Sequence, residues 1–229
     1  MEGVRAVEEL LRSDLRIRGA LVAPQLADAP RGAALLAQLR ARGIDVADLA
    51  PLDFASAAET ESPQGVLAVA DIPSRSVETL VLPAVARLVV LDAVQDPGNV
   101  GTILRTAAAL GACAVLAMPG TVDLWNAKVV RSAMGAHFQM PAFACEWDAL
   151  DRLRRREGVV VWAADAGGTA LDALVPPARL ALLMGNEGAG PSPEGLARAD
   201  AVAALPIGQL VESLNVAVAT GIFLYQLRT

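Results

Sequence analysis

Residues 88–105 read LVVLDAVQDPGNVGTILR, and this stretch decides the fold class. Leu88–Leu91 is a continuous apolar run without alternation, which is typical of a strand buried on both faces of a parallel sheet. A turn at Pro97 follows, and we expect an Ala- and Leu-rich helix from about Val100, with Asn99 able to cap it. The stretch therefore predicts one strand–loop–helix unit of an α/β domain.

The same pattern recurs along residues 85–229. Four further apolar runs predict buried strands at Ala114–Ala117, Val159–Ala163, Leu180–Met184 and Val202–Pro206. Helical patterns lie between the runs, at Gly101–Leu110, Ala127–Met134, Trp147–Arg156, Glu194–Ala199 and Leu214–Leu227. This alternation predicts an α/β domain with a doubly wound parallel sheet. Ligands of such sheets bind in the loops beyond the carboxyl ends of the strands, so the search for a site belongs there.

Residues 1–73 predict a separate, smaller α/β domain. Its expected helices are Val4–Leu11 and Ala33–Arg42, and its expected strands are Ala20–Ala23, Ile44–Val46 and Gly65–Ala70. A unit of this size needs a tight core or a partner domain for stability. Residues 74–84 follow, and we interpret them as a linker between the two domains.

Composition excludes several classes of protein. A hydrophobic fraction of 54% with 19% charged residues rules out intrinsic disorder, and the net charge of −6 argues against a generic basic nucleic-acid coat. No uncharged stretch is long enough to span a membrane, and the start of the chain shows no signal peptide. Cys113, Cys145 and the single histidine, His137, cannot make an ordinary zinc site, so we expect no metal and a cytoplasmic protein with structural cysteines.

Three loop segments carry more polar and glycine residues than connectors need: 92–105, 183–191 and 205–216. The glycines of the second loop are spaced as GxxGxG, and Lys128 is the only lysine, which counts against dinucleotide and P-loop sites. Taken singly, each loop has an ordinary interpretation as a tight turn or a helix cap, with Ser213 or Asn215 capping a final amphipathic helix that begins near Ser213.

Taken together, the three loops resemble the signature motifs of the SpoU (TrmH-type) family, the RNA 2′-O-ribose methyltransferases of the SPOUT class. The first motif matches at residues 96–107 (DPGNVGTILRTA), the second at 184–188 (MGNEG), and the third at 205–207 (LPI) with 212–216 (ESLNV). Residues 128–138 resemble the family's intermediate segment. Residues 1–73 resemble the ribosomal-protein-like substrate-binding domain that many members carry.

The resemblance implies a cofactor, S-adenosylmethionine, held in a C-terminal trefoil knot, and a homodimer. The cofactor-binding residues that it implies are Met184, Gly185, Gly188, Pro206, Ile207, Leu214 and Asn215. It also implies that Arg105 acts at the 2′-hydroxyl with Asn99 orienting it, and that Glu187, Ser213 and Asn215 position these groups. Because the pKa of arginine exceeds about 12, Arg105 is either a specially desolvated base or, as we favour, an electrostatic clamp.

The resemblance implies structured RNA as the partner, and the uneven distribution of charge is compatible with it despite the net charge of −6. Between residues 97 and 141 the charged side chains are Arg105, Lys128 and Arg131 against Asp123 alone. We expect RNA contacts from a set of cationic residues: Arg12, Arg16, Arg18, Lys128 and Arg131. The arginines of residues 152–156 are expected on a solvated helix face, and His137 is expected to be packed or to face RNA.

The first domain favours ribosomal RNA as substrate, because tRNA-specific relatives generally lack such a domain. Transfer RNA methylation remains an alternative within this class. A non-catalytic RNA-binding protein that has kept the fold is the main alternative from another class. A nucleotide-dependent oxidoreductase on a similar sheet lacks its fingerprint.

Overall fold

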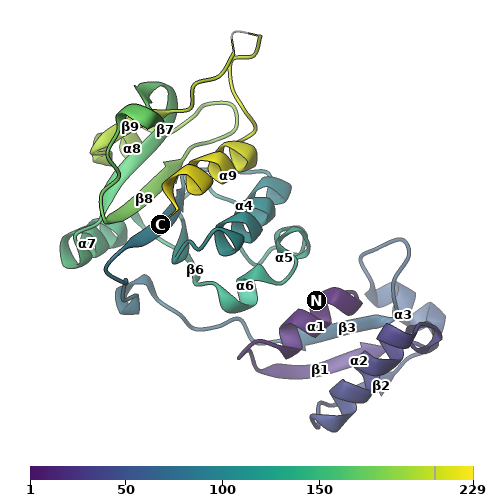
Figure 1. Cartoon of the computed structure of the whole chain (residues 1–229). Coiled ribbons are helices and arrows are strands. Elements are labelled where there is room, and N and C mark those ends of the chain that lie inside the picture. The colour runs from purple at the N-terminus through teal and green to yellow at the C-terminus, as the bar shows by residue number, and fades with distance from the viewer. Residues whose placement is uncertain (209, 229) are drawn as a thin grey trace. The chain divides into compact units, whose positions relative to one another are not determined.

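A computed structural model describes residues 1–208 and 210–228 of the chain (Figure 1). The chain divides into two compact units, Met1–Ser74 and Arg75–Thr229, which we call unit 1 and unit 2. Each unit has its own sheet. They are described one after the other.

Unit 1 is a three-stranded sheet with helices. The central strand β1 (Ile17–Val22) runs parallel to β2 (Val46–Asp48) and antiparallel to β3 (Val66–Ala70). Its helical elements are α1 (Val4–Leu11), the 3₁₀ turn η1 (Pro24–Asp28), α2 (Pro30–Ala41) and α3 (Pro51–Ala57). The predicted helix over 4–11 is confirmed. Helix α3 was not predicted, because it buries only Phe54 and so has no apolar period.

Unit 2 is built on six parallel strands in the order β6-β5-β4-β8-β7-β9, which confirms the predicted parallel sheet. The strands are β4 (Ala86–Leu91), β5 (Ala114–Ala117), β6 (Ala142–Ala144), β7 (Val160–Ala170), β8 (Arg179–Met184) and β9 (Ala201–Ala204). Every residue of β4 is buried, as its unbroken apolar run predicts. The three residues of β6 are too few to show a pattern in sequence.

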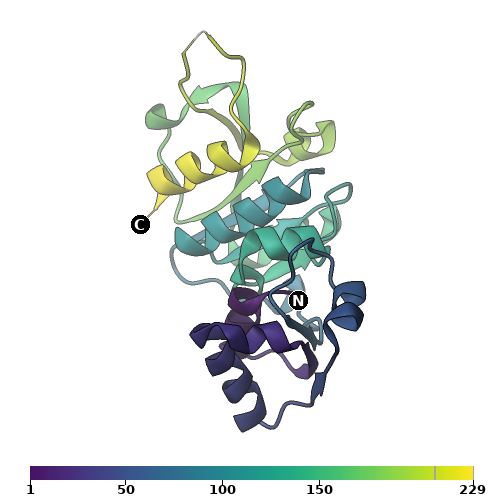
Figure 2. The same cartoon turned by 90° about the vertical axis from the view of Figure 1, so that its right-hand side faces the viewer.

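Helices cover both faces of this sheet, and the side chains of β4 point alternately into two cores. Val89 and Leu91 pack in the core beneath α4 (Pro97–Ala109), α5 (Ala127–Ala133) and α9 (Val216–Leu227), whereas Leu88 and Val90 pack beneath α7 (Trp147–Glu157). Short helical elements complete the unit: η2 (Val77–Thr79), α6 (Ala136–Gln139), η3 (Leu171–Ala173) and α8 (Pro193–Arg198). Figure 2 shows α9 lying beside α4, with which it makes contact.

Two helix starts differ from prediction. Helix α4 begins at Pro97 rather than Val100, and Asp96 rather than Asn99 caps it, because the Asp96 carboxylate accepts the backbone N–H of Asn99 at 2.8 Å. Helix α9 begins at Val216 rather than near Ser213, and of the two predicted caps Asn215 is the one that caps it. The first difference leaves the side chain of Asn99 available for other partners.

The segment 76–83 packs on unit 2. Val77 and Leu82 are buried in the core beneath α7. The guanidinium of Arg156 donates to the carbonyl oxygens of Val77, Glu78 and Leu80, and that of Arg179 donates to those of Leu82 and Pro83. The residues that connect the two sheets therefore form part of unit 2 from Arg75 onward.

The arginines of α7 lie on a largely exposed face, as predicted for residues 152–156, and three of them also bind other segments of unit 2. Arg154 pairs with Asp200 at 2.8 Å, and Arg152 pairs with Glu78 at 3.0 Å. Hydrogen bonds from Ser76 and Arg152 lower the pKa of Glu78 to about 2. Arg152, Arg154 and Arg156 therefore also have a structural role on this helix.

Gly101 sets the distance between α4 and α5. A Cβ at this position would lie 2.4 Å from the Ser132 Cβ and 2.6 Å from the carbonyl oxygen of Val129. We predict that Gly101→Ala lowers the free energy of unfolding by about 1–3 kcal/mol through overpacking, measured by urea denaturation. The control is Thr102→Ser on the exposed face of α4, which should stay within about 0.5 kcal/mol of the parent. Equal stability of the two variants would contradict this account of the contact.

Candidate active site

The three loops singled out in sequence meet at the carboxyl ends of β4, β8 and β9, at one edge of the sheet of unit 2. A cavity of about 360 Å³ lies there. Its walls come from the middle of β7 (Val160–Ala170), the loop after β8, the loop after β9 and the first turns of α9. The lining residues are Ala164, Asp165, Ala166, Met184, Gly185, Asn186, Glu187, Gly188, Ala189, Gly190, Ala203, Leu205, Ile207, Glu212, Ser213, Leu214, Val216, Ala219 and Phe223.

The loop after β8 is a closed turn. Asn186 and Gly190 exchange two backbone hydrogen bonds of 2.9 Å, and the Asn186 side-chain oxygen accepts two further backbone N–H groups within the turn. Its side-chain nitrogen donates to the Ala93 carbonyl oxygen at 2.9 Å, which fastens the turn to the loop after β4. A Cβ on Gly185 would lie 2.1 Å from backbone atoms of Gly190 and Pro191, so the turn requires glycine there.

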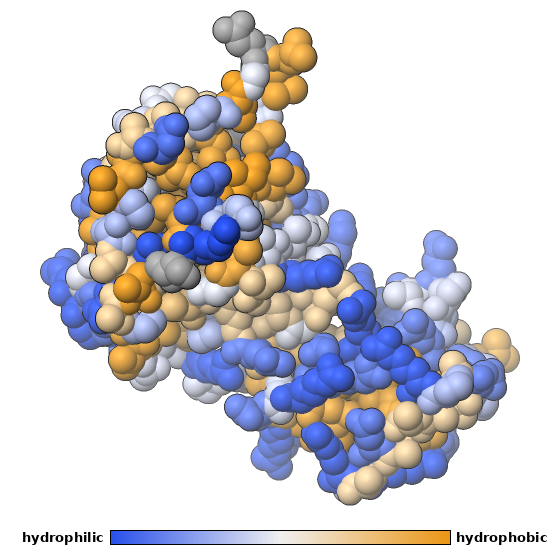
Figure 3. Space-filling view, viewed as in Figure 1, coloured by the Kyte–Doolittle hydropathy of each residue, from blue (hydrophilic) through white to orange (hydrophobic). Residues whose placement is uncertain are grey.

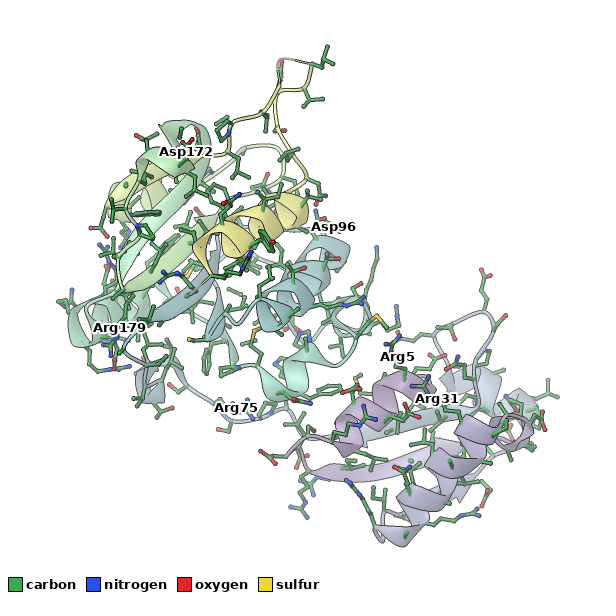
Figure 4. All side chains as sticks on the ribbon, in the orientation of Figure 1. Arg5, Arg31, Arg75, Asp96, Asp172 and Arg179 are labelled. Atoms are coloured by element: carbon green, nitrogen blue, oxygen red, sulfur yellow. The ribbon has the colours of Figure 1, made fainter. Side chains whose placement is uncertain are left out.

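A chain of hydrogen bonds joins all three loops. The Glu187 carboxylate accepts the Asn99 side-chain N–H at 3.1 Å and the backbone N–H groups of Gln95 and Asp96. The Asn99 side-chain oxygen in turn accepts an N–H from Asn215 at 2.9 Å, and Asn215 caps α9. Figure 4 shows Asp96, which caps α4, near the start of α9. The sequence-predicted residues Asn99, Glu187 and Asn215 therefore form one cluster.

The charge of Glu187 is stabilised within this cluster. Partial burial works to raise the pKa of Glu187, but the hydrogen bonds from Asn99 and from backbone N–H groups outweigh it and lower the pKa below its ordinary value of 4.5. Glu187 is therefore a carboxylate at neutral pH, and it acts as a hydrogen-bond acceptor.

The cavity contains most of the residues predicted to bind a cofactor. Five of the seven line it: Met184, Gly185, Gly188, Ile207 and Leu214. Pro206 instead lines a neighbouring cavity of about 500 Å³ that shares Leu205, Ile207 and Leu214 with the first. Asn215 lines neither cavity and acts as the cap of α9. Of the residues predicted to be catalytic, Glu187 and Ser213 lie in the wall.

Arg105 lies further along α4 than this cluster. It follows Asn99 by six residues, which is about 9 Å along a helix axis. Its side chain is exposed, and one of its terminal nitrogens contacts the sulfur of Met134 at 3.0 Å. Met134 has a left-handed backbone with φ of 51°. Asn99 thus contacts Glu187 and Asn215, whereas Arg105 contacts the end of α5.

Sequence reasoning missed several residues of the cavity, of which Asp165 and Glu212 are the charged ones. Asp165 follows the buried run of β7 directly, so the rule that ligands bind after the strands could have found it. Glu212 lies within the third motif, beside Ser213. The apolar wall residues Ala203, Val216 and Phe223 carry no signal that separates them from core residues.

Two family models cover nearly the whole chain. The model described as the SpoU rRNA Methylase family matches residues 86–225. The chain belongs to the SpoU rRNA methylase family. A second model, described as RNA 2'-O ribose methyltransferase substrate binding, matches residues 1–76. The family predicted from the motifs is thereby confirmed.

Relatives of this SpoU family chain extend over both units. It is 36% identical over its full length to the 23S rRNA (guanosine(2553)-2'-O)-methyltransferase RlmP of Bacillus subtilis, covering 87% of that protein. The crystal structure of an AdoMet-bound rRNA methyltransferase from Sinorhizobium meliloti has a TM-score of 0.85 at 30% identity, over 99% of this chain and 85% of that one. A solved structure concerned with 2-OH methylation of C/U34 on tRNA covers 63% of this chain and 95% of its own, with a TM-score of 0.53 at 29% identity.

Several of the cationic residues predicted to contact RNA are ion-paired in this SpoU family chain. Arg12 pairs with Glu9 at 2.6 Å, and Arg18 pairs with Asp71 at 2.7 Å. Arg16 accepts a hydrogen bond from Asp71 through its backbone carbonyl group. In unit 2, Lys128 is exposed and Arg131 is half-buried, both on α5. Whether these residues contact RNA stays a prediction.

Three further features concern metal-binding groups, membrane-spanning helices and the reactivity of Cys145. Within residues 1–208 and 210–228, no group of three or more histidine, cysteine or acidic side chains is placed to hold a metal ion. None of the helices in those ranges is both long enough and apolar enough to cross a bilayer. Burial raises the pKa of the Cys145 thiol to about 11, so this cysteine is protonated at neutral pH and unreactive.

His137 is a packed residue of this SpoU family chain. Its side chain is buried, its Nε2 lies 2.7 Å from the Leu124 carbonyl oxygen, and its ring lies against Trp125. Nε2 therefore carries the proton that it donates to this oxygen. Nδ1 is buried and has no hydrogen-bond partner among the described residues. Burial lowers the pKa of His137 below its ordinary value of 6.5, although the Leu124 hydrogen bond opposes the shift.

This depressed pKa makes stability depend on pH. Below pH 6.5 His137 is protonated in the unfolded chain, whereas burial keeps it neutral in the folded chain. The free energy of unfolding therefore falls as pH decreases, by at most about 1.4 kcal/mol per pH unit. We predict this loss between pH 7.5 and 5.5 in urea denaturation. Because this is the only histidine, His137→Phe should be less stable at pH 7.5 but should show a flat profile. An unchanged slope in the variant would assign the effect to other groups.

Proposed function

We propose that this chain transfers a methyl group from S-adenosylmethionine to a ribose 2′-hydroxyl of structured RNA, with ribosomal RNA as the substrate class. The observation that carries the proposal is the cavity formed by the second and third motifs, joined to the first motif by Glu187 and Asn99. The AdoMet-bound relative and the relative named as a 23S rRNA 2'-O-methyltransferase support it.

Ribosomal RNA is favoured over tRNA by the extent of the matches. The rRNA methyltransferases from B. subtilis and S. meliloti match 99–100% of the chain, including unit 1. The structure concerned with tRNA matches 63% of this chain, although that is 95% of its own length. Unit 1 is thus shared with the rRNA enzymes, and we infer that it docks on a folded rRNA segment. Mapping 2′-O-methylated positions in rRNA from a deletion strain, with tRNA mapped in parallel, tests the choice.

The cavity fits the proposed cofactor. Its volume of about 360 Å³ lies within the range of about 300–1,000 Å³ that is typical of small-molecule sites. Leu205, Ile207 and Leu214 provide apolar walls, and the turn from Gly185 to Gly190 provides backbone donors and acceptors at close approach. When bound, S-adenosylmethionine would supply a methyl group activated by its sulfonium. The trefoil knot that the family resemblance implies stays a prediction.

Arg105 would stabilise the charge that develops on the ribose oxygen. A guanidinium is always protonated in proteins and carries no acceptor, so it cannot remove the hydroxyl proton directly. Its exposed position and its fork of N–H donors suit a developing alkoxide or a neighbouring phosphate. The hydrogen bonds among Glu187, Asn99 and Asn215 would fix the positions of α4 and α9 beside the cofactor. Ser213 would contact the cofactor from the cavity wall.

We predict that Arg105→Ala lowers the single-turnover rate of methyl transfer by about 100- to 1,000-fold, because the developing charge loses its donor. Arg105 does not line the cavity, so the Kd for S-adenosylmethionine should change by less than about twofold. Transfer is measured with tritium-labelled cofactor and binding by isothermal titration calorimetry. Near-normal turnover would sink this assignment. Cofactor binding without transfer to any RNA by the parent chain would instead favour the non-catalytic alternative.

We also propose a homodimer that forms through α9. One face of α9 packs on unit 2, yet Val218, Ile222 and Tyr225 on its other side are 53%, 38% and 55% exposed. Helix α9 is therefore apolar on both sides, in contrast to the amphipathic helix that was predicted. The loop that precedes this helix is also apolar and exposed at Leu210 and Val211, and apolar side chains are visible at the top of the space-filling view (Figure 3). Exposed apolar surface of this kind marks interaction sites.

The dimer can be tested with charge substitutions on α9. We expect the parent chain to elute as a dimer in size-exclusion chromatography with light scattering. Val218→Glu combined with Tyr225→Glu should convert it to a monomer, because two carboxylates would be desolvated in the interface. The control is Leu52→Glu in unit 1, where the leucine is 86% exposed, and it should leave the mass unchanged. A monomeric parent, or a dimeric double variant, would contradict this interface.

The two cysteines, which are both free thiols, support a reducing compartment such as the cytoplasm.

A further inference from the structure

The charged residues of the cavity wall are all acidic. Asp165, Glu187 and Glu212 contribute carboxylates, and no lysine, arginine or histidine is present among the described residues that line the cavity. The three come from three different segments: β7, the loop after β8 and the loop after β9. A partly enclosed cavity with charges of one sign creates a field that favours ligands of the opposite charge.

The Asp165 carboxylate has a fixed position in the wall of the cavity. It lies at an irregularity where the pairing of β7 with β9 shifts register between Ala164 and Thr169. One carboxylate oxygen accepts the backbone N–H of Gly167 at 2.8 Å, which fixes the side chain. The other oxygen points toward the turn after β8, since a Cβ built on Gly190 would lie 3.5 Å from it. Glu187, by contrast, already accepts hydrogen bonds from Asn99 and Asp96.

The reaction proposed above changes the charge of the cavity's ligand. The methyl carbon leaves sulfur and bonds to the ribose oxygen, the electron pair of the broken bond stays on sulfur, and the hydroxyl proton is released. The sulfonium cation is thereby converted to a neutral thioether. An acidic wall therefore interacts differently with the substrate and with the product of the same site.

We propose that the acidic wall makes this site select the cationic methyl donor over its neutral product, and that Asp165 is a specificity-determining residue for this choice. The inference rests on the proposed function. Two opposite unit charges about 4 Å apart change an equilibrium constant about fivefold even at the dielectric of water. A single carboxylate in a partly enclosed cavity can therefore make the affinity for the cationic methyl donor higher than that for the neutral product, which favours replacement of the product by a new donor.

The experiment is isothermal titration calorimetry of the full chain with three probes. S-adenosylmethionine and sinefungin both carry a positive charge at the position of the transferred methyl group, and S-adenosylhomocysteine does not. We expect Asp165→Asn to raise the Kd for the two charged probes about three- to tenfold, and that for S-adenosylhomocysteine by less than about twofold. Asparagine keeps the oxygen that accepts the Gly167 N–H, so the bulge should be preserved.

Glu212→Gln provides a second variant of the wall, and the same selective loss is expected for it. The matched control is Asp172→Asn, because Asp172 lines the neighbouring cavity and not this one (Figure 4). It should leave all three Kd values unchanged. The selective loss should also shrink as salt is raised from 50 to 500 mM, because screening weakens charge interactions.

Two results would overturn the inference. One is an equal weakening of all three probes in Asp165→Asn, which would make Asp165 a contact to a group that they share. The other is no change for any probe in both Asp165→Asn and Glu212→Gln. A parent chain that binds none of the probes would contradict the proposed function itself, so the two failures are distinguishable.

Discussion

The hydrogen-bond chain from Glu187 through Asn99 to Asn215 is the interaction on which the site depends. It joins segments that are 88 and 116 residues apart in sequence. The backbone N–H and C=O groups of loops beyond the strands are not paired with a neighbouring strand, so side chains provide hydrogen-bond partners for them. The Glu187 carboxylate does this for two N–H groups of the loop after β4, and Asn215 does it for the first turn of α9. The walls of the cavity are thereby held together by polar contacts.

The sheet brings these loops together. Strand β4 has β5 on one side and β8 on the other, and its side chains enter both cores. Since all six strands run parallel, the segments that follow β4, β8 and β9 emerge at the same edge. Gly101 in α4 and Gly185 after β8 then allow the close approaches that side chains would prevent. Apolar packing therefore decides where the loops are, and hydrogen bonds decide their shape.

The net charge does not show how acidic and basic residues are distributed over the molecule. The net charge is −6, and two arginines of unit 1, Arg12 and Arg18, are neutralised by Glu9 and Asp71. The wall of the cavity is acidic, whereas α4 and α5 carry Arg105, Lys128 and Arg131. A donor of positive charge and an RNA of negative charge thus have separate surfaces in the proposed reaction. With few unpaired cations on unit 1, its proposed docking to RNA would rely on shape.

Local patterns predicted most elements of the fold, because an apolar period of two or 3.6 residues reports burial directly. They failed for β6, which is only three residues long, and for α3, which buries Phe54 alone and so has no apolar period. Capping was harder to predict. Asp96 and Asn99 are both good caps three residues apart, and only the structure shows that Asp96 takes the role in α4. The arginines of α7 likewise have sequence neighbours typical of a solvated face, yet Arg156 binds carbonyl groups 76 to 79 residues away.

The sequence by itself determined the alternating α/β pattern and the family motifs, and five of the seven residues that these motifs imply for cofactor binding line the cavity. These properties can be recognised from residues that are close together in the sequence, either as a hydrophobic period or as a short motif. The tertiary structure alone decided that Asn99 joins Glu187 to Asn215, that Pro206 faces the neighbouring cavity, and that Asp165 faces the first one. Each of these depends on the register between strands that are distant in sequence. The packing of side chains in the cores on both faces of the sheet sets this register.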